Sequence, residues 1–158
     1  MRRASRRRQG MWLSHSTALA RDIRHIVSVE MSPTSSADLA YNRPSNGEVI
    51  RATTEQYLAR ANRSGRVGKC AVLPHTSYRP DLVVADPPRS GLGERVAREL
   101  ATLGAPRVVY VSCDPATLAR DLVTLLAAGY RLEQLHLVDL FPQTFHLETV
   151  VHLVREGN

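Results

Sequence analysis

Cysteine is scarce in this 158-residue chain, which holds only Cys70 and Cys113. Two thiols cannot build a disulfide framework or a four-cysteine metal or iron–sulfur site. The six histidines lack the spacing of a metal site. No apolar run approaches the roughly 18 residues of a membrane span, and no apolar segment of a secretory signal follows the basic N-terminus. We therefore expect a reduced, cytoplasmic protein with neither a metal nor a membrane partner.

The net charge of +6 is concentrated at the start of the chain. Residues 1–25 hold seven Arg against one Asp, whereas the remaining residues hold 14 basic and 14 acidic side chains. Such an arginine-rich segment either contacts nucleic-acid phosphates in a salt-dependent way or is simply a solvated terminus. We expect residues 1–16 to be disordered or degenerate and residues 17–158 to form the folded part.

Apolar, β-branched stretches alternate with helical patterns, which is typical of βαβ units and a parallel α/β sheet. Strands are predicted over 26–30, 49–52, 81–85 and 107–111, and helices over 35–41, 54–61, 94–103 and 116–127. Residues 62–80 read as a long irregular connection. The final strands, predicted over 132–140 and 149–154, should pair antiparallel because a short loop joins them.

Residues 86–93 read Asp-Pro-Pro-Arg-Ser-Gly-Leu-Gly and follow a predicted strand. The two prolines remove backbone donors and hold the loop extended, so the Asp86 side chain should project into a cleft. Ligands of open α/β sheets bind beyond the carboxyl ends of the strands. Because Glu30, Asp86 and Cys113 all follow or end such strands, we expect them to converge on one edge. The alternative for Asp86 is a plain strand-ending turn.

Residues 111–122 read Val-Ser-Cys-Asp-Pro-Ala-Thr-Leu-Ala-Arg-Asp-Leu. Pro115 suits the first turn of a helix, and a thiol beside a helix N-terminus gains thiolate character and nucleophilicity. Cys113 is therefore a candidate nucleophile, although a lone cysteine at a strand end is more often a small buried residue. Cys70 lacks such a context, and we assign it a structural role.

Residues 141–148 read Phe-Pro-Gln-Thr-Phe-His-Leu-Glu and end on a carboxylate among apolar neighbours. Burying Glu148 is costly unless it is paired or its pKa rises, and a raised pKa suits a proton acceptor near neutral pH. The alternative is an exposed residue at a strand edge. His146 fits a structural or substrate-orienting role better than a catalytic one.

Together the three motifs resemble the RNA (uracil-5-)methyltransferase family, which modifies tRNA and large-subunit rRNA. The resemblance covers residues 80–155 and, less closely, residues 17–61. It implies a Rossmann-like class I methyltransferase sheet, mostly parallel with an antiparallel C-terminal strand pair. It also implies S-adenosylmethionine as the methyl donor and RNA as the partner.

The resemblance assigns roles to four residues. Cys113 matches the nucleophile that adds to C6 of uracil, and Glu148 matches the base that removes the C5 proton. Glu30 and Asp86 match positions that line the methyl-donor pocket, with Glu30 suited to the ribose hydroxyls. Such chemistry is reasonable because uracil C5 is a poor nucleophile until a covalent adduct activates it.

The chain departs from the family pattern before the helix that leads to Glu30. The family's glycine-rich turn falls on Met11 and Leu13, and its first strand falls on residues 6–9, whose charges do not suit a buried parallel strand. Thr53, also a candidate N-cap, stands where the family has an acidic adenine contact. We therefore expect an N-terminally truncated or degenerate, partial catalytic domain.

Three functional interpretations stay open at this point. The chain is a competent RNA methyltransferase, a catalytically silent RNA-binding fragment that cannot bind the cofactor alone, or a remnant that needs a partner polypeptide to supply the missing half. Binding of S-adenosylmethionine by the purified chain would separate the first interpretation from the other two.

Overall fold

The computed structural model describes residues 23–64, 80–139 and 147–156. The basic segment 1–16, with the positions of the expected glycine-rich turn, lies outside the described residues. The chain divides into two compact units, residues 1–57 and residues 58–158. None of the helices in the described part combines the length and the apolar character that crossing a bilayer requires.

The first unit contains β1 (Ile26–Glu30), α2 (Pro33–Asn42) and β2 (Gly47–Arg51). The two strands pair in parallel along their whole length, and α2 packs against both of them. Helix α2 begins after Ser32, whose Oγ accepts the N–H of Ser35 at 3.4 Å, and Pro33 occupies its first turn. This βαβ arrangement confirms the strand–helix–strand order predicted for this region.

Helix α3 (Thr54–Ser64) begins with a reciprocal cap. The Thr53 Oγ1 accepts the N–H of Gln56 at 3.1 Å, and the Gln56 Oε1 accepts the N–H of Thr53 at 3.3 Å. The helix extends three residues beyond its predicted end. Its last turn is held by Asn62, whose Nδ2 donates to the carbonyl oxygen and Oε2 of Glu99 at 3.0 and 2.6 Å.

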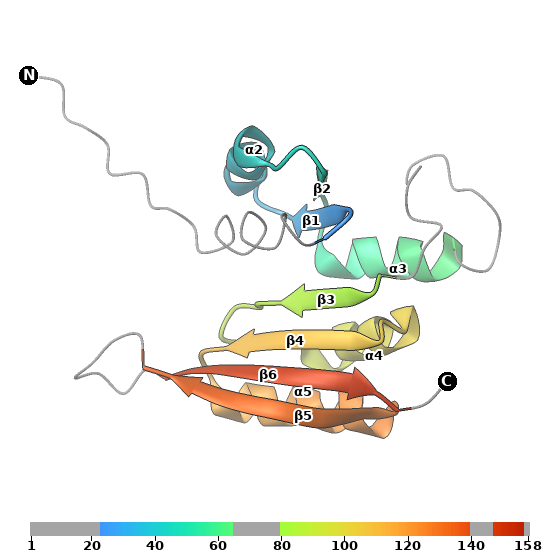
Figure 1. The fold of residues 1–158 in the computed structure, drawn as a ribbon, viewed down its shortest axis with the longest axis vertical. Coiled ribbons are helices and arrows are strands. Elements are labelled where there is room, and N and C mark those ends of the chain that lie inside the picture. Colours follow the sequence, from blue (N-terminus) through green and yellow to red (C-terminus); the bar gives the residue numbers. More distant parts are fainter. Residues whose placement is uncertain (1–22, 65–79, 140–146, 157–158) are drawn as a thin grey trace, which may run out of the picture. The chain divides into compact units, whose positions relative to one another are not determined.

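The second unit is built on a four-stranded sheet in the order β3-β4-β6-β5 (Figure 1). The elements along the chain are β3 (Leu82–Ala85), α4 (Gly93–Leu103), β4 (Arg107–Ser112), α5 (Pro115–Ala127), β5 (Tyr130–Val138) and β6 (Glu148–Arg155). Strands β3 and β4 are parallel, whereas β6 runs antiparallel to both β4 and β5. The predicted antiparallel C-terminal pair is therefore confirmed.

Strand β5 begins two residues earlier than predicted. Gly129 has a left-handed φ of 90°, which lets the chain leave α5 abruptly. The next residue, Tyr130, is already buried, and its hydroxyl donates to the carbonyl oxygen of Ala105 at 2.7 Å. The long-range hydrogen bond fixes the start of β5 at a position that the local pattern does not reveal.

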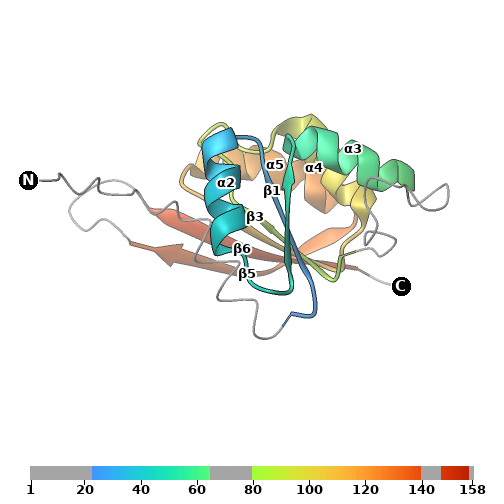
Figure 2. The same ribbon diagram turned by 90° about the horizontal axis from the view of Figure 1, so that it is seen from above.

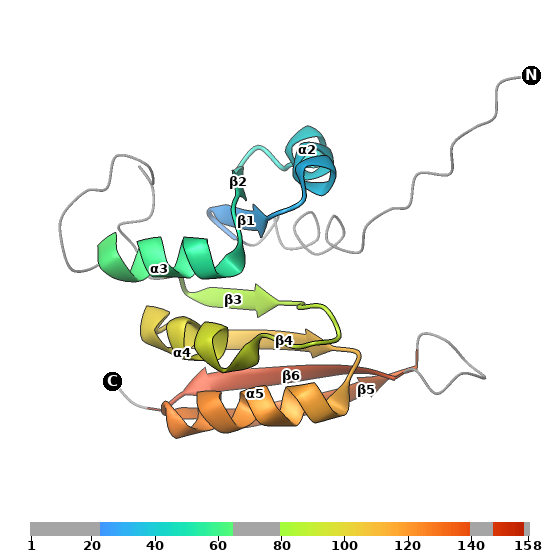
Figure 3. The same ribbon diagram turned by 180° about the vertical axis from the view of Figure 1, so that it is seen from behind.

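Helices α4 and α5 both cover the same face of the four-stranded sheet (Figures 2 and 3). The apolar residues of this layer alternate along the strands and recur at helical spacing, as burial of one face requires. The buried set from these elements includes Val96, Leu100, Val108, Tyr110, Leu118, Leu125, Val151 and Leu153. Within the described residues, β1 pairs only with β2, and β3 pairs only with β4, on one side each.

Candidate active site

Asp86 and Cys113 lie at the same edge of the four-stranded sheet. Strands β3 and β4 are parallel, and their last matched pair places Ala85 opposite Tyr110. Asp86 directly follows β3, and Cys113 directly follows Ser112 at the end of β4. Because the carboxyl ends of parallel neighbours share an edge, the expected convergence of Asp86 and Cys113 is observed. Both residues are half-buried.

Glu148 reaches the same edge from the opposite strand direction. It is the first residue of β6, which runs antiparallel to β4 with Ser112 opposite Thr149. One step further along this register, Glu148 comes level with Cys113. On its other side Glu148 pairs with Val138 of β5, and its side chain is half-buried. The sheet thus brings three of the four predicted site residues to one edge.

Glu30, the fourth predicted residue, ends β1 in the first unit. Its Oε1 accepts the N–H of Ser32 at 2.7 Å, and its carbonyl oxygen accepts the N–H of Ala52 at 3.2 Å. The carboxylate therefore has a defined orientation beyond the carboxyl end of its strand. Its convergence with Asp86 and Cys113 stays a prediction.

Cys113 carries a free thiol in a tightly fixed turn. The buried Oγ of Ser112 donates to the carbonyl oxygen of Asp114 at 2.9 Å and accepts the N–H of Asp114 at 3.2 Å. These two contacts close the backbone on both sides of Cys113. The thiol is thereby held between the end of β4 and the start of α5, as the sequence predicts.

Asp114 is the N-cap of α5, and its Oδ1 accepts the N–H of Thr117 at 2.9 Å. The hydrogen bond from Thr117 lowers the pKa of the Asp114 carboxyl below its usual value, with a smaller contribution from the charge of Arg89. The ionised carboxylate favours the first turn of α5 because it faces the unsatisfied N–H groups there.

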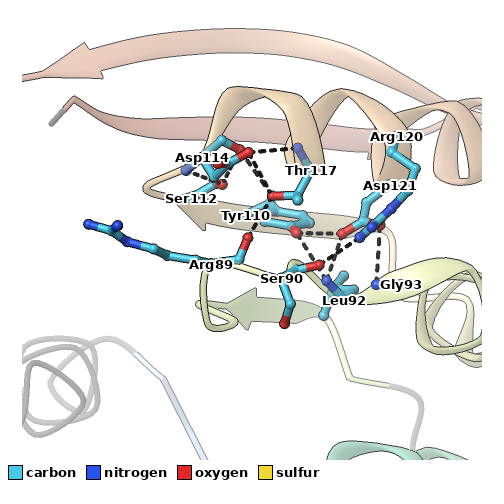
Figure 4. Close-up of polar contacts among 10 residues, drawn as sticks. All are labelled: Arg89, Ser90, Leu92, Gly93, Tyr110, Ser112, Asp114, Thr117, Arg120 and Asp121. Carbon is cyan, nitrogen blue, oxygen red and sulfur yellow. Dashed lines mark hydrogen bonds and ion pairs between the residues drawn. The ribbon is translucent and has the colours of Figure 1, made fainter. Parts of the chain in front are cut away.

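The loop that begins at Asp86 is bound to α5 through its main chain (Figure 4). The Thr117 Oγ1 donates to the carbonyl oxygen of Arg89 at 3.0 Å. Nη2 of Arg120 donates to the carbonyl oxygen of Ser90 at 2.8 Å. Two residues of the helix thus bind two successive carbonyl groups of the loop.

The third contact is made by Asp121, whose side chain is fully buried. Its Oδ2 accepts the N–H of Leu92 at 2.6 Å and the hydroxyl of Tyr110 at 2.7 Å. Its Oδ1 accepts the N–H of Gly93 at 3.2 Å and the Nη2 donor of Arg120 at 2.9 Å. Burial and the hydrogen bond to Asp121 raise the pKa of Tyr110 well above its ordinary value.

Sequence reasoning missed the contacts of Asp121, although a signal was present. Asp121 follows Leu118 by three residues and precedes Leu125 by four, so it lies on the buried stripe of α5. An acidic residue at such a position needs hydrogen-bond partners.

Within the described ranges no three His, Cys, Asp or Glu side chains gather as metal ligands would.

Comparison with protein families gives one match that covers most of the chain. The model of the tRNA (Uracil-5-)-methyltransferase family matches residues 13–156. The 23S rRNA (uracil(1939)-C(5))-methyltransferase RlmD of Pseudomonas fluorescens is 45% identical over 136 residues, which are 84% of this chain and 27% of that protein. An uncharacterized RNA methyltransferase of Thermotoga maritima is 51% identical over 83 residues, 52% of this chain and 19% of its own length. The chain thus spans about a quarter or less of these relatives.

Solved structures give the same result. The tRNA (uracil-54, C5)-methyltransferase of Pyrococcus abyssi, in complex with S-adenosyl-L-homocysteine, matches with a TM-score of 0.60 and 26% identity over 85% of this chain and 30% of that one. The N-methyltransferase NodS of Bradyrhizobium japonicum shares the fold alone, with a TM-score of 0.63 and 11% identity over 92% of this chain and 82% of that chain.

These matches confirm the predicted α/β class I methyltransferase-like fold, with a mixed sheet and an antiparallel C-terminal strand pair. The family match extends over all three sequence motifs, residues 86–93, 111–122 and 141–148. The chain belongs to the tRNA (uracil-5-)-methyltransferase family and covers part of that family's catalytic region.

Proposed function

We propose that this chain transfers a methyl group from S-adenosylmethionine to C5 of a uridine in tRNA or rRNA. The observation that carries the proposal is the shared position of Asp86, Cys113 and Glu148 at one edge of the sheet, in a chain that belongs to the uracil-5-methyltransferase family. A nucleophile and a carboxylate brought level by strand pairing form the pair of groups that this reaction needs.

Cys113 begins the proposed reaction as its nucleophile. Its sulfur forms a bond to C6 of the uracil ring, and the electron pair of the C5=C6 double bond moves onto C5 and the neighbouring C4 carbonyl. C5 becomes nucleophilic only in this adduct, so the covalent route replaces one difficult step with two easier ones. The turn closed by Ser112 and Asp114 holds the backbone of the thiol in place.

Glu148 ends the proposed reaction as its base. When bound, S-adenosylmethionine would supply the electrophilic methyl group that C5 takes up, and S-adenosylhomocysteine would be released. Glu148 then accepts the remaining C5 proton, the electrons of that C–H bond restore C5=C6, and the sulfur of Cys113 leaves. The target base has to be turned out of any stack to reach both side chains.

The residues proposed for the methyl donor fit its chemistry. Glu30 uses Oε1 to accept the N–H of Ser32, which orients the carboxylate without using up its acceptor capacity. Each carboxylate oxygen has two lone pairs, so both can still accept from vicinal ribose hydroxyls. We assign Asp86 to the methyl donor as well, because it follows β3 at the carboxyl edge of its sheet, where ligands of open α/β sheets bind.

RNA containing 5-fluorouridine tests the proposal directly. Transcripts of tRNA and 23S rRNA fragments that carry 5-fluorouridine in place of uridine are incubated with the chain and S-adenosylmethionine. Fluorine at C5 cannot be removed as a proton, so a methylated covalent complex should accumulate. Mass spectrometry should place the bond on Cys113, with full yield retained in Cys70→Ala, the matched thiol control.

Two results would overturn this function. A Cys113→Ala variant that forms the adduct with undiminished yield would remove Cys113 from the mechanism. A wild-type chain that binds the RNA but neither binds S-adenosylmethionine nor forms an adduct would favour the silent RNA-binding interpretation.

A further inference from the structure

We propose that Thr117, Arg120 and Asp121 are positioning residues that fix the Asp86 loop, residues 86–93, relative to Cys113. We call these three side chains the α5 latch. The latch rests on the proposed function only for its effect on methyl transfer. Its mechanical part, the coupling of the loop to the helix that follows Cys113, stands on the contacts alone.

The latch binds main-chain groups of the loop in sequence. Thr117 and Arg120 donate to the carbonyl oxygens of Arg89 and Ser90. Asp121 accepts the N–H groups of Leu92 and Gly93 (Figure 4). These contacts depend on the path of the loop and leave its side chains available for other roles.

Asp121 is suited to hold the loop because an ionised carboxylate accepts hydrogen bonds through both of its oxygens and presents no donor. One of its oxygens takes the Leu92 N–H at 2.6 Å, and the other takes the Gly93 N–H at 3.2 Å. An Asn side chain would turn an NH₂ donor toward one of those N–H donors. A buried carboxylate is a costly way to gain stability, whereas it specifies a single geometry well when all its partners are present.

Gly91 shows that the loop follows one defined path against the latch. Its φ of 74° lies in the left-handed region, and an added Cβ would come within 2.5 Å of Asp121 Oδ2 and 2.8 Å of Arg120 Nη2. The backbone of the loop therefore passes directly over the carboxylate. No side chain fits between them.

The latch couples two parts of the candidate site. Helix α5 starts at Pro115, two residues after Cys113, and the loop starts at Asp86. A rigid contact between them sets the position of the Asp86 carboxylate relative to the thiol. Small displacements of reacting groups lower rates strongly, by as much as about 100-fold for roughly 1 Å.

The experiment compares Asp121→Asn with Asp81→Asn in a Cys70→Ala chain. Asp81 is exposed and precedes β3, at the opposite end of that strand from Asp86, so it controls for the change in charge. Amide hydrogen exchange measures how firmly the loop is held. A trifluoroacetonyl group attached to Cys113 gives a fluorine NMR signal that depends on the surroundings of the Cys113 side chain. Asp121→Asn should speed exchange of the Leu92 and Gly93 amides at least tenfold and shift or split the fluorine signal.

Functional coupling is measured in the same variants with Cys113 left unlabelled, using 5-fluorouridine RNA. Asp121→Asn should slow formation of the Cys113 adduct at least tenfold, and Asp81→Asn should leave its rate unchanged. Should Asp121→Asn not fold, Arg120→Met replaces it. That side chain is half exposed, and its loss should still speed exchange in the loop and slow adduct formation.

The outcomes separate the latch from the proposed function. Unchanged loop exchange, or an unchanged fluorine signal beside faster loop exchange, would overturn the positioning inference. Adduct formation at the wild-type rate with a loosened loop would overturn it as well. If the wild-type chain forms no adduct, the proposed function fails, and the exchange and NMR measurements still decide the mechanical coupling.

Discussion

Gly91 and Gly93 offer a matched pair for testing how rigidly Asp121 is held. Their φ angles are nearly equal, 74° and 75°. A Cβ at Gly91 would lie 2.5 Å from Asp121 Oδ2. Apart from its chain neighbours and the backbone of its own helix, nothing among the described residues lies within 4 Å of a Cβ at Gly93. Alanine therefore imposes the same backbone strain at both positions, and only Gly91→Ala displaces the buried carboxylate.

The expected magnitudes follow from these two effects. A left-handed backbone costs a non-glycine residue about 1–2 kcal/mol, which is the whole expected cost of Gly93→Ala. Moving Asp121 also weakens hydrogen bonds to a charged group, each worth about 1.5–3 kcal/mol. We therefore expect Gly91→Ala to lower the free energy of unfolding by about 2.5–5 kcal/mol, a large share of the roughly 5–15 kcal/mol of an ordinary domain.

Urea unfolding followed by far-ultraviolet circular dichroism measures both variants under the same conditions. Gly91→Ala should lose at least about 1.5 kcal/mol more than Gly93→Ala, the value of one such hydrogen bond. Equal losses would refute the reasoning, because they would mean that Asp121 gives way freely and does not hold the loop.

Three further predictions concern single contacts. Ser112→Ala should lower the free energy of unfolding by about 1–2 kcal/mol in urea titrations, because both hydrogen bonds to Asp114 are lost; no loss would show that the turn does not depend on them. Thr53→Ala should cost about 1 kcal/mol by removing the reciprocal cap with Gln56, and an unchanged urea midpoint would contradict this. The folded-state pKa of Asp114 is depressed, so its stabilising effect is present above its unfolded pKa near 3.8 and is lost as pH falls below it. The stability difference between wild type and Asp114→Asn should therefore shrink between pH 7 and pH 3, and a constant difference would count against the cap.

The order of the elements was predictable because it depends on local signals. Strands such as β3 and β4 show as β-branched runs, and prolines mark the loop after Asp86 and the start of α5. Parallel strands share a carboxyl edge, so the sequence also predicted that Asp86 and Cys113 would lie at one edge of the sheet together with Glu30, whose place there stays a prediction. The family resemblance added Glu148, which the pairing of β6 with β4 brings level with Cys113.

The remaining features depend on contacts between distant parts of the chain. The end of α3 is fixed by Asn62 and Glu99, which are 37 residues apart. Asp121 lies on the buried stripe of its helix, but two of its partners come from a loop 28 and 29 residues away. No local pattern identifies such partners. In the sequence, the buried carboxylate therefore shows only as an acidic residue on the apolar stripe of its helix.

Release of tritium from RNA labelled at C5 of its uridines tests the central claim most directly, because a methyl group can replace that hydrogen only if the full reaction occurs. Incubated with S-adenosylmethionine and unmodified tRNA or rRNA fragments, the wild-type chain should release tritium in step with methyl incorporation. Cys113→Ala should release none, and Glu148→Gln should form the methylated complex without releasing tritium. A Cys113→Ala chain that releases tritium at the wild-type rate, or a wild-type chain that releases none, would contradict the account.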